Sequence, residues 1–567
     1  MFDVIIHGGD VIDGTGAPRR RADVGISGER ISTIGDLDGA EAAQTIDASG
    51  RVVSPGFIDV HTHIDAQIFW DTTVSPSPLH GVTTVIAGNC GFSISPLSDD
   101  PADGDYLMRM LSRVEGMPLQ SLAEGVPWNW TSTAEYLDAL ESKLSINAGF
   151  NVGHSALRRV VMGLDATRRE ATDDEIKGMC YLLRAGLEAG AIGFTSSWSA
   201  THNDTEQNMV PSRYASRDEL IDLCAVLAHF PGTSLEFIPG IGRFDDSIAQ
   251  LMTDMSLAAR APLNWNVLAV TPQTLDACFE KLGTSDYAEA RGAKVVGLTA
   301  PMSLDFRMSF ASGFLLDAVP GWEEAMLLPK EDKLALLRDS ERRADLGEIA
   351  AGKHNMRHFT NWAKMTIFHT VAPENANAIG RNIGEIAAER GTTPWDALCD
   401  IAVADDLETS FGHPSVDEPD ANWEARLQIW RDPRAVIGAS DAGAHLDMFF
   451  SADYATKMIE EAVVKRNLLP LEEAINLLTA VPADLYFLRD RGRVTEGAYA
   501  DLIVFDEQEI ASNPMEMRSD LPAGASRLYA AADGIDHVLC NGVEIVRHGE
   551  FTDARPGTIL RSGIHTG

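Results

Sequence analysis

The middle of the chain alternates short apolar runs with longer amphipathic stretches. Eight runs favour β-strands, because β-branched and aromatic residues are bounded by Gly, Pro or Asn: FIDVHTH, TTVIAGNC, GFNVGHS, AIGFTSS, SLEFIPG, LNWNVLA, KVVGLTAP and AVIGASDAG. Between them, residues 172–189 and 216–229 begin with Ser or Thr, continue with acidic residues, and then place apolar residues at helical spacing. Strands alternating with helices predict an α/β fold, a TIM-like (β/α)8 barrel with its active site at the carboxyl ends of the strands.

The two ends of the chain carry a different pattern. Residues 1–53 and 490–567 consist of short strand-like runs joined by turn residues, so they predict one small β-sandwich domain built from both termini. Residues 54–489 then form the barrel. Residues 302–433 separate the seventh and eighth runs and are too long for a simple loop, which predicts a helical insertion late in the barrel.

The amino-acid composition limits the classes of partner that we expect for this protein. The 567 residues include 46 basic and 84 acidic side chains, and a net charge of -38 would repel nucleic acid and anionic membrane surfaces. We find neither a signal peptide nor an apolar run of transmembrane length. The six cysteines are scattered without a CxxC pair, which favours a reducing cytoplasm. The pattern is compatible with a homo-oligomer, and the expected partner is a small molecule.

Candidate metal ligands fall at the ends of several predicted strands. His61 and His63 are two residues apart and would project from the same face of the first strand. Cys90 ends the second strand, His154 the third, and Asp441 the eighth. Alone, the histidines could be surface residues, Cys90 a small buried side chain, and Asp441 a turn residue. Because strand ends meet at one barrel edge, imidazole, thiol and carboxylate together indicate a site for Zn²⁺ or a similar divalent ion.

These motifs resemble a known family. VVSPGFIDVHTHIDAQ, GVTTVIAGNCGFSISP, NVGHSALRRVVMG and VIGASDAGAH, with the closing LTAVPADLYFLRDRGRVTEGAYADLIVFD, are similar to the amidohydrolase superfamily, and most to its N-acyl-D-amino-acid deacylase (D-aminoacylase) group. The resemblance implies a metal-dependent TIM barrel with a β-sandwich, and hydrolysis of an amide or related bond. It also implies that His61, His63, Cys90 and Asp441 occupy the metal and catalytic positions, with one or two ions bound.

The chain departs from that group at two places. The group has histidines on strands five and six, where this sequence has Glu236 and Asn266. Glu236 could supply a carboxylate ligand instead, or both residues could be polar residues at the barrel mouth. A single ion bound by His61, His63 and Asp441, with Cys90 nearby, is therefore the expected arrangement. Leu268 stands where the group has a substrate-binding lysine, so we expect an apolar or bulky amide, carbamate or cyclic imide.

The sequence therefore predicts a metal-dependent amidohydrolase that acts on carbon–nitrogen bonds other than peptide bonds. Asp441 is the expected catalytic base, taking a proton from water and passing it to the leaving nitrogen. The alternative is a non-catalytic scaffold or binding barrel that has lost a metal site. Several further side chains could reach the mouth or belong to the core: His202, Arg158, Trp128, Trp130, Phe306, Phe314 and Trp362.

Overall fold

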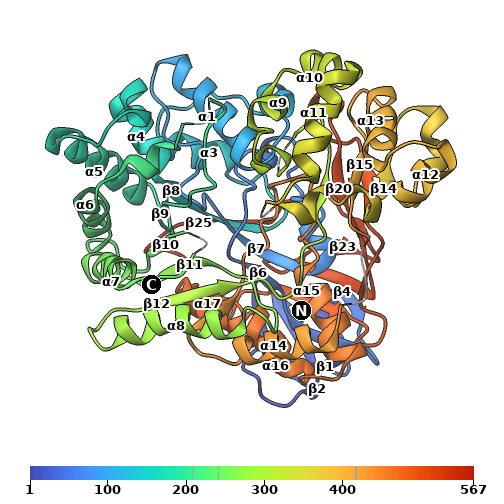
Figure 1. Cartoon of the computed structure of the whole chain (residues 1–567). Coiled ribbons are helices and arrows are strands. Elements are labelled where there is room, and N and C mark those ends of the chain that lie inside the picture. Colours follow the sequence, from blue (N-terminus) through green and yellow to red (C-terminus); the bar gives the residue numbers. More distant parts are fainter. Residues whose placement is uncertain (207, 241, 314, 355, 415–417) are drawn as a thin grey trace.

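Eight parallel strands form a curved sheet at the centre of the molecule (Figure 1). The computed structural model describes residues 1–567 except 207, 241, 314, 355 and 415–417. The strands follow chain order around the sheet and overlap the eight predicted runs: β6 (Phe57–Asp59), β7 (Val82–Ala87), β8 (Asn147–Gly153), β9 (Gly193–Ser197), β10 (Ser234–Ile238), β11 (Leu263–Leu268), β12 (Val295–Thr299) and β16 (Ala435–Ile437). A parallel bridge between Thr62 and Ala442 joins the segments that follow the first and last strands. The predicted TIM-like barrel is confirmed.

Helices between the strands pack on the outer face of this sheet (Figure 1): α1 (Pro101–Val114), α2 (Leu119–Gly125), α3 (Thr133–Leu140), α4 (His154–Met162), α5 (Asp173–Glu188), α6 (Arg217–Leu227), α7 (Asp246–Ala259) and α8 (Leu275–Glu289). Helices α5 and α6 begin where the sequence predicts. Thr172 and Ser216 cap them, because each side chain accepts a hydrogen bond from a backbone N–H of the first helical turn. Buried apolar residues of α5, including Leu183, join Phe194 of β9 in one core cluster. Among the described residues, no helix combines the length and apolar character needed to cross a bilayer.

Strands from both ends of the chain share a second, nine-stranded sheet. Its members are β1 (Phe2–Val11), β2 (Arg20–Ser27), β3 (Arg30–Gly35), β4 (Ala42–Asp47), β5 (Val52–Pro55), β17 (Leu502–Phe505), β22 (Ile535–Cys540), β23 (Val543–Arg547) and β24 (Glu550–Phe551). β5 pairs with β17, and this contact joins the N-terminal and C-terminal strands. The sequence therefore folds its two ends into one β-rich unit beside the barrel.

The remaining C-terminal elements follow different paths. After β16, the chain forms α15 (Tyr454–Met458), a π-helical turn, α16 (Leu471–Leu478) and α17 (Ala480–Leu485). Two short hairpin-like pairs precede β22, namely β18 (Ala511–Ser512) with β21 (Ala532–Asp533), and β19 (Glu516–Arg518) with β20 (Arg527–Tyr529). β25 (Ile559–Leu560) leaves the terminal sheet and pairs with β8 of the barrel.

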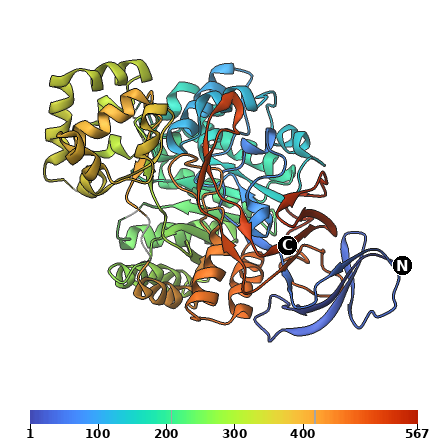
Figure 2. The same cartoon turned by 90° about the vertical axis from the view of Figure 1, so that its right-hand side faces the viewer.

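The segment between β12 and β16 has its own apolar core. It contains a three-stranded sheet, β13 (Arg307–Met308), β15 (Ser410–Gly412) and β14 (Thr366–His369), with helices α9 (Glu323–Leu327), α10 (Lys330–Arg338), α11 (Ser340–Ala351), α12 (Ile383–Arg390), α13 (Pro394–Ala404) and α14 (Asp420–Trp430). Trp322, Trp362 and Trp395 pack together in that core. Figure 2 shows this segment and the terminal sheet at opposite ends of the molecule, with the barrel between them.

Candidate metal centre

The first site segment is held between the two edges of the barrel. After β6, Thr62 N and Oγ1 both donate to Ile86 O of β7. On the other side, His63 N donates to Ala442 O and Asp441 N donates to His61 O. Because this segment is extended, His61 and His63 alternate with Thr62 and project to the same side. Both histidine side chains are 2% exposed.

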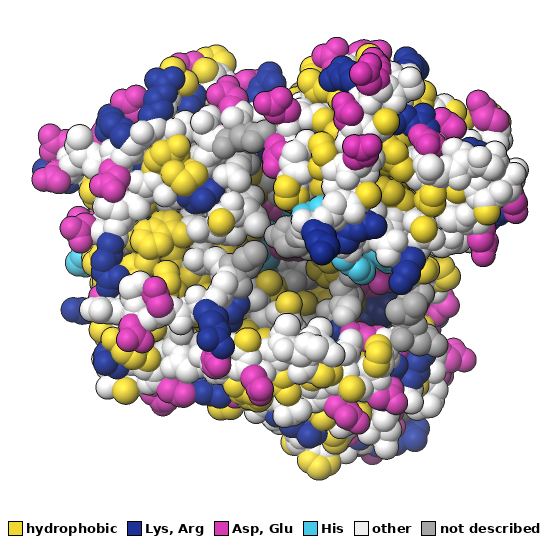
Figure 3. All heavy atoms as spheres, in the orientation of Figure 1, with side chains coloured by type: hydrophobic (Ala, Val, Ile, Leu, Met, Phe, Trp, Pro, Cys, Tyr) yellow, Lys and Arg dark blue, Asp and Glu magenta, His cyan; other side chains and the backbone are white. Residues whose placement is uncertain are grey.

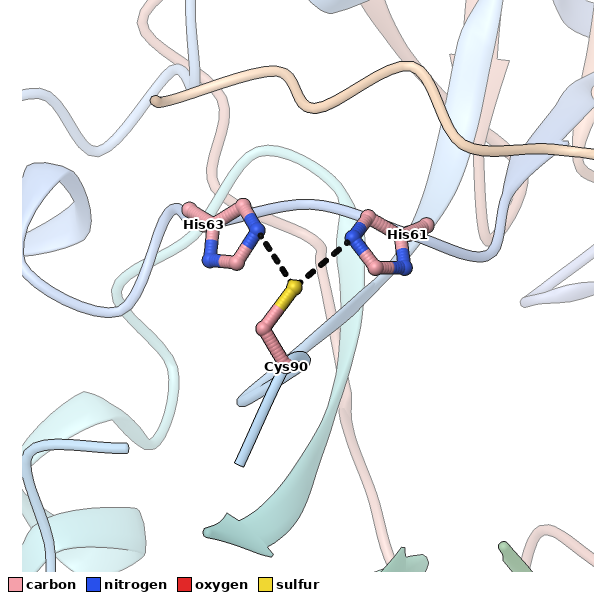
Figure 4. A group of neighbouring side chains, drawn as sticks. All are labelled: His61, His63 and Cys90. Atoms are coloured by element: carbon pink, nitrogen blue, oxygen red, sulfur yellow. Dashed lines mark hydrogen bonds between the residues drawn. The ribbon is translucent and has the colours of Figure 1, made fainter. Parts of the chain in front are cut away.

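Cys90 meets the two imidazoles from the end of β7. Its sulfur lies 3.4 Å from His61 Nε2 and 3.6 Å from His63 Nε2, and both rings turn these nitrogens toward it (Figure 4). The three ligand atoms lie within 4.8 Å of one another. Cys90 has a φ of +59°, a left-handed conformation that is costly for a residue with a Cβ, and the turn aims the thiol at the histidines.

Asp441 completes the group from the loop after β16. Its Oδ1 lies 3.1 Å from His61 Nε2 and 3.4 Å from His63 Nε2. Unlike the histidines, its side chain is 31% exposed, so it borders both the buried cluster and the open mouth. Asp441 also lines a pocket with about 400 Å³ of empty space, together with Ile64, Leu446 and Phe449. Figure 3 shows the face of the molecule hollowed near its centre, with basic and histidine side chains at the rim.

The distances fit one divalent ion. Bond lengths of about 2.0–2.1 Å to nitrogen and 2.3 Å to sulfur, in tetrahedral geometry, separate neighbouring ligand atoms by about 3.3–3.6 Å. The separations of the two Nε2 atoms from Cys90 Sγ and Asp441 Oδ1 run from 3.1 to 3.6 Å. Imidazole, thiolate and carboxylate form a donor set suited to Zn²⁺. The residues present therefore fit the ion that their chemistry predicts.

The electrostatics of the cluster also favour a cation. Burial alone would lower the pKa of His63, but the carboxylates of Glu115, Asp441 and Asp65 raise it to about 9. Burial raises the pKa of the Cys90 thiol well above its ordinary value, and nearby acids add to the effect. For Asp441, hydrogen bonds from both histidines outweigh burial and hold the pKa well below its usual range. Without an ion, positive charge in the cluster must therefore be supplied by protons on imidazole.

Glu236 and Asn266 lie behind the cluster and contact each other. Glu236 accepts a 2.9 Å hydrogen bond from Cys90 N, and Asn266 Nδ2 lies within hydrogen-bond distance of Glu236 Oε1 and 2.8 Å from His61 Nδ1. Burial raises the pKa of Glu236 to about 8. An imidazole that binds a metal through Nε2 keeps its hydrogen on Nδ1, so the Asn266 amide must present its oxygen there. In the present orientation, Asn266 Oδ1 has no hydrogen-bond partner among the described residues.

Glu115 and His445 also reach the site, although the strand pattern did not indicate them. Glu115 Oε2 lies 3.6 Å from His63 Nε2 and 3.9 Å from His445 Nε2. Glu115 follows the end of α1, whereas the predicted ligands all follow barrel strands. The only sequence signal was an acidic residue before glycine at a helix end, where a basic residue is more usual.

His154 and Arg158 do not join the cluster. His154 Nδ1 contacts Ser196 Oγ and its Nε2 contacts Glu219 Oε1, both at 2.8 Å. Arg158 donates to the same Glu219 carboxylate, and all three side chains of this ion-pair network are fully buried. The expectation that His154 would meet the other strand-end ligands was wrong, because α4 begins at that residue and turns it toward α6.

The other side chains considered from the sequence have mixed placements. Trp130 and Trp362 are buried in core clusters, and Trp128 packs against the core beside Trp130. Phe306 instead contacts Phe449, a lining residue of the pocket beside Asp441. His202 packs on Phe92, and burial lowers its pKa to about 3. Leu268 is 1% exposed in a core cluster. Phe314 lies outside the described residues.

Known proteins are similar to this chain over nearly its whole length. The model of the amidohydrolase family matches residues 44–546. A D-aminoacylase from Alcaligenes xylosoxydans xylosoxydans is 29% identical over 564 residues, which cover 99% of this chain and 97% of the relative. A crystal structure of D-aminoacylase has a TM-score of 0.65 and 28% identity, covering 99% of this chain and 100% of that chain.

A third similar protein was crystallised with a ligand. The structure of N-acyl-D-glutamate deacylase from Bordetella bronchiseptica contains zinc and a phosphonate inhibitor that mimics the tetrahedral intermediate. It has a TM-score of 0.65 and 25% identity, covering 99% of this chain and 100% of that chain. The hydrolase prediction is confirmed by these similarities, whereas the non-catalytic alternative has no support in them. The chain belongs to the amidohydrolase family and is a metal-dependent hydrolase of carbon–nitrogen bonds other than peptide bonds.

Proposed function

We propose that this protein deacylates N-acyl amino acids with an apolar side chain or acyl group, releasing a carboxylic acid and a free amine. The observation that carries the proposal is the meeting of His61, His63, Cys90 and Asp441 at the carboxyl ends of the first, second and eighth barrel strands. This donor set combines a metal site with a carboxylate that also borders the open mouth. A metal-independent scaffold has no need for that combination.

The roles of the chain's own residues follow from their positions. His61, His63, Cys90 and Asp441 would hold one divalent ion, which supplies Lewis acidity and lowers the pKa of water. Asp441 accepts a proton from the attacking water as the new carbon–oxygen bond forms. It then returns that proton to the amide nitrogen as the carbon–nitrogen bond breaks, so protons and electrons balance. The low pKa of Asp441 keeps the carboxylate ionised and ready to accept.

The substrate class is supported by relatives and by the rim. The similar proteins are a D-aminoacylase and an N-acyl-D-glutamate deacylase, which favours an N-acyl amino acid of D configuration here. Phe449 lines the pocket beside Asp441, and Phe306 extends the aromatic surface toward the insertion. Burying an apolar group against such rings contributes about 1.5–3 kcal/mol. An apolar substrate side chain therefore suits the aromatic part of this rim, which Phe449 and Phe306 form.

The test uses the full chain loaded with Zn²⁺ or Co²⁺ and a panel of N-acetyl-D-amino acids. We expect higher kcat/KM for the leucine and methionine derivatives than for the glutamate and aspartate derivatives. Asp441→Asn should lower kcat by about 10²- to 10⁴-fold, the range for loss of an acid–base group. Asp453→Asn, a buried acid bonded to Ser512, is the matched control and should retain activity. No turnover of any panel member by the metal-loaded protein would refute the proposal.

A further inference from the structure

Glu115 is a buried acid placed against the metal cluster. Its side chain is 3% exposed, and its Oε2 lies 3.6 Å from the Nε2 atom that His63 directs at the cluster. From the same nitrogen, Cys90 Sγ lies at 3.6 Å and Asp441 Oδ1 at 3.4 Å. Three donor atoms thus surround His63 Nε2 at nearly equal distances. Such spacing is expected of ligands that share one ion.

The position of Glu115 is unfavourable without a cation. Glu115 is the residue that ends α1, where the partial negative charge of the helix disfavours another negative charge. Burial adds a desolvation penalty, because a buried carboxylate needs either a charge partner or a metal. Its carboxylate lies within ion-pair distance of His63 and His445.

The local backbone is built to keep Glu115 in this place. Glu115 O accepts a 2.5 Å hydrogen bond from His445 N, and His445 has a left-handed φ of +51°. Gly116 has a φ of +58°, and a Cβ there would lie 3.1 Å from His445 Cα. Glycine therefore favours this close approach of the end of α1 to the loop that carries Asp441. The strain and the close approach together fix the carboxylate beside His63.

We infer that Glu115 is a further ligand of the ion, through Oε2, beside His63. This inference rests on the single-ion site of the proposed function and adds to it a donor from α1. Glu236 is a less suitable donor, because its two oxygens already contact Cys90 N and Asn266 Nδ2. The carboxylate that replaces a missing strand ligand thus comes from a helix end beside His63, whereas Asn266 lies beside His61.

The test measures ion affinity rather than turnover. Zn²⁺ dissociation constants, obtained by chelator competition on the full chain, should rise at least about 10-fold in Glu115→Gln. The visible spectrum of the Co²⁺-loaded protein should also change, because the number of donors around the ion falls. Glu115→Asp keeps the charge but shortens the side chain, and it should bind more weakly than the parent protein as well. Asp453→Asn is the matched control, a buried acid bonded to Ser512 rather than to a member of the cluster, and it should bind Zn²⁺ within twofold of the parent value.

Two outcomes would overturn the inference. One is a Zn²⁺ dissociation constant within twofold of the parent value in both Glu115 variants. The other is a weaker affinity with an unchanged Co²⁺ spectrum, which would mean that Glu115 acts only through its charge. If Glu115→Gln does not fold, Glu115→Asp decides alone. Failure of the substrate panel would leave these binding results intact, so the inference and the proposed function can fail separately.

Discussion

At the scale of single residues, the site is assembled from strained backbone positions. Cys90, Ala439, Asp441 and His445 all have φ between +51° and +59°, and none of them is glycine. Each such conformation costs about 1–2 kcal/mol. Strain of this kind persists where the surrounding structure holds it for function. Here it lets two loops turn sharply at the strand ends and direct their side chains at a common point.

Removing the Asn266 amide should weaken ion binding without affecting the fold. Asn266 contacts His61 Nδ1 at 2.8 Å and so fixes the ring that presents Nε2 to the cluster. For Asn266→Ala we expect about 10- to 100-fold weaker Zn²⁺ binding, the usual cost of losing a partner of a ligating histidine. Asn264→Ala is the control, since Asn264 lies two residues earlier on β11 and bonds Leu235 O and Tyr486 OH. Equal losses in both variants would contradict the orienting role.

Residue placement shows what the sequence could and could not reveal. His61, His63, Cys90 and Asp441 were found because all four follow barrel strands, and parallel strands bring their carboxyl ends together. Glu115 was not predicted as a site residue, because the end of a helix reaches the site through tertiary packing, and such packing leaves no periodic pattern in the sequence. The pairing of His154 with Glu219 spans 65 residues and is equally invisible in local sequence.

At the scale of elements, the site depends on how the barrel closes. The loop after β16 runs against the segment after β6, and Gly443 lies where the two backbones are nearest. Its φ is +93°, and a Cβ there would lie 2.7 Å from His63 C and O. The same contact that closes the barrel therefore sets the separation of Asp441 from the two histidines.

Gly443→Ala should disrupt both stability and ion binding. The backbone of His63 would have to move, and strain plus displacement should cost about 3 kcal/mol or more. Gly497→Ala is the matched control, because Gly497 has a similar φ of +89° with nothing within 4 Å of an added Cβ. That variant should lose only about 1 kcal/mol. Urea unfolding and Zn²⁺ affinity check the prediction, and similar behaviour of both variants would contradict it.

Helices and strands were predicted correctly where the local sequence contains a clear pattern for them. All eight barrel strands overlap the predicted runs, because β-branched residues bounded by Gly, Pro and Asn mark them, although β7 and β8 begin one and two residues earlier than predicted. The helix starts at Asp173 and Arg217 follow the capping residues. The pairing of β25 with β8 was not predicted, because two residues near the end of the chain carry no signal of their distant partner.

At the scale of the whole molecule, the two chain ends are linked by a side-chain hydrogen bond as well as by strand pairing. Glu544 of β23 accepts hydrogen bonds from Gln44 of β4 and from Arg547, and contacts His537 of β22 at 2.5 Å. Burial alone would raise the pKa of Glu544, but these partners lower it to about 2. The unfolded chain, with an ordinary value near 4.5, therefore binds a proton before the folded chain does.

Acid should therefore remove a defined part of the stability. The contribution of Glu544 is fully present above pH 4.5 and is lost as the pH falls toward 2. Glu544→Gln should lower the free energy of unfolding at pH 7 by up to about 3 kcal/mol, and the difference from the parent should shrink below pH 4.5. Glu550→Gln, an exposed position on β24, is the control. Urea titrations at pH 7 and pH 3.5 compare them, and a pH-independent difference would contradict the assignment.

The insertion between β12 and β16 has its own apolar core, and this separation affects how the protein can change its substrate pocket. It leaves the barrel after β12 and returns at β16, and these two strands are direct neighbours through Gly297 and Ala435. Both attachment points therefore lie side by side, and a segment with its own apolar centre can be replaced between them without moving a strand. Phe306 carries this segment to the pocket rim. Evolution or protein engineering could therefore replace the insertion, and with it one side of the substrate pocket, without changing the metal cluster at the barrel strand ends.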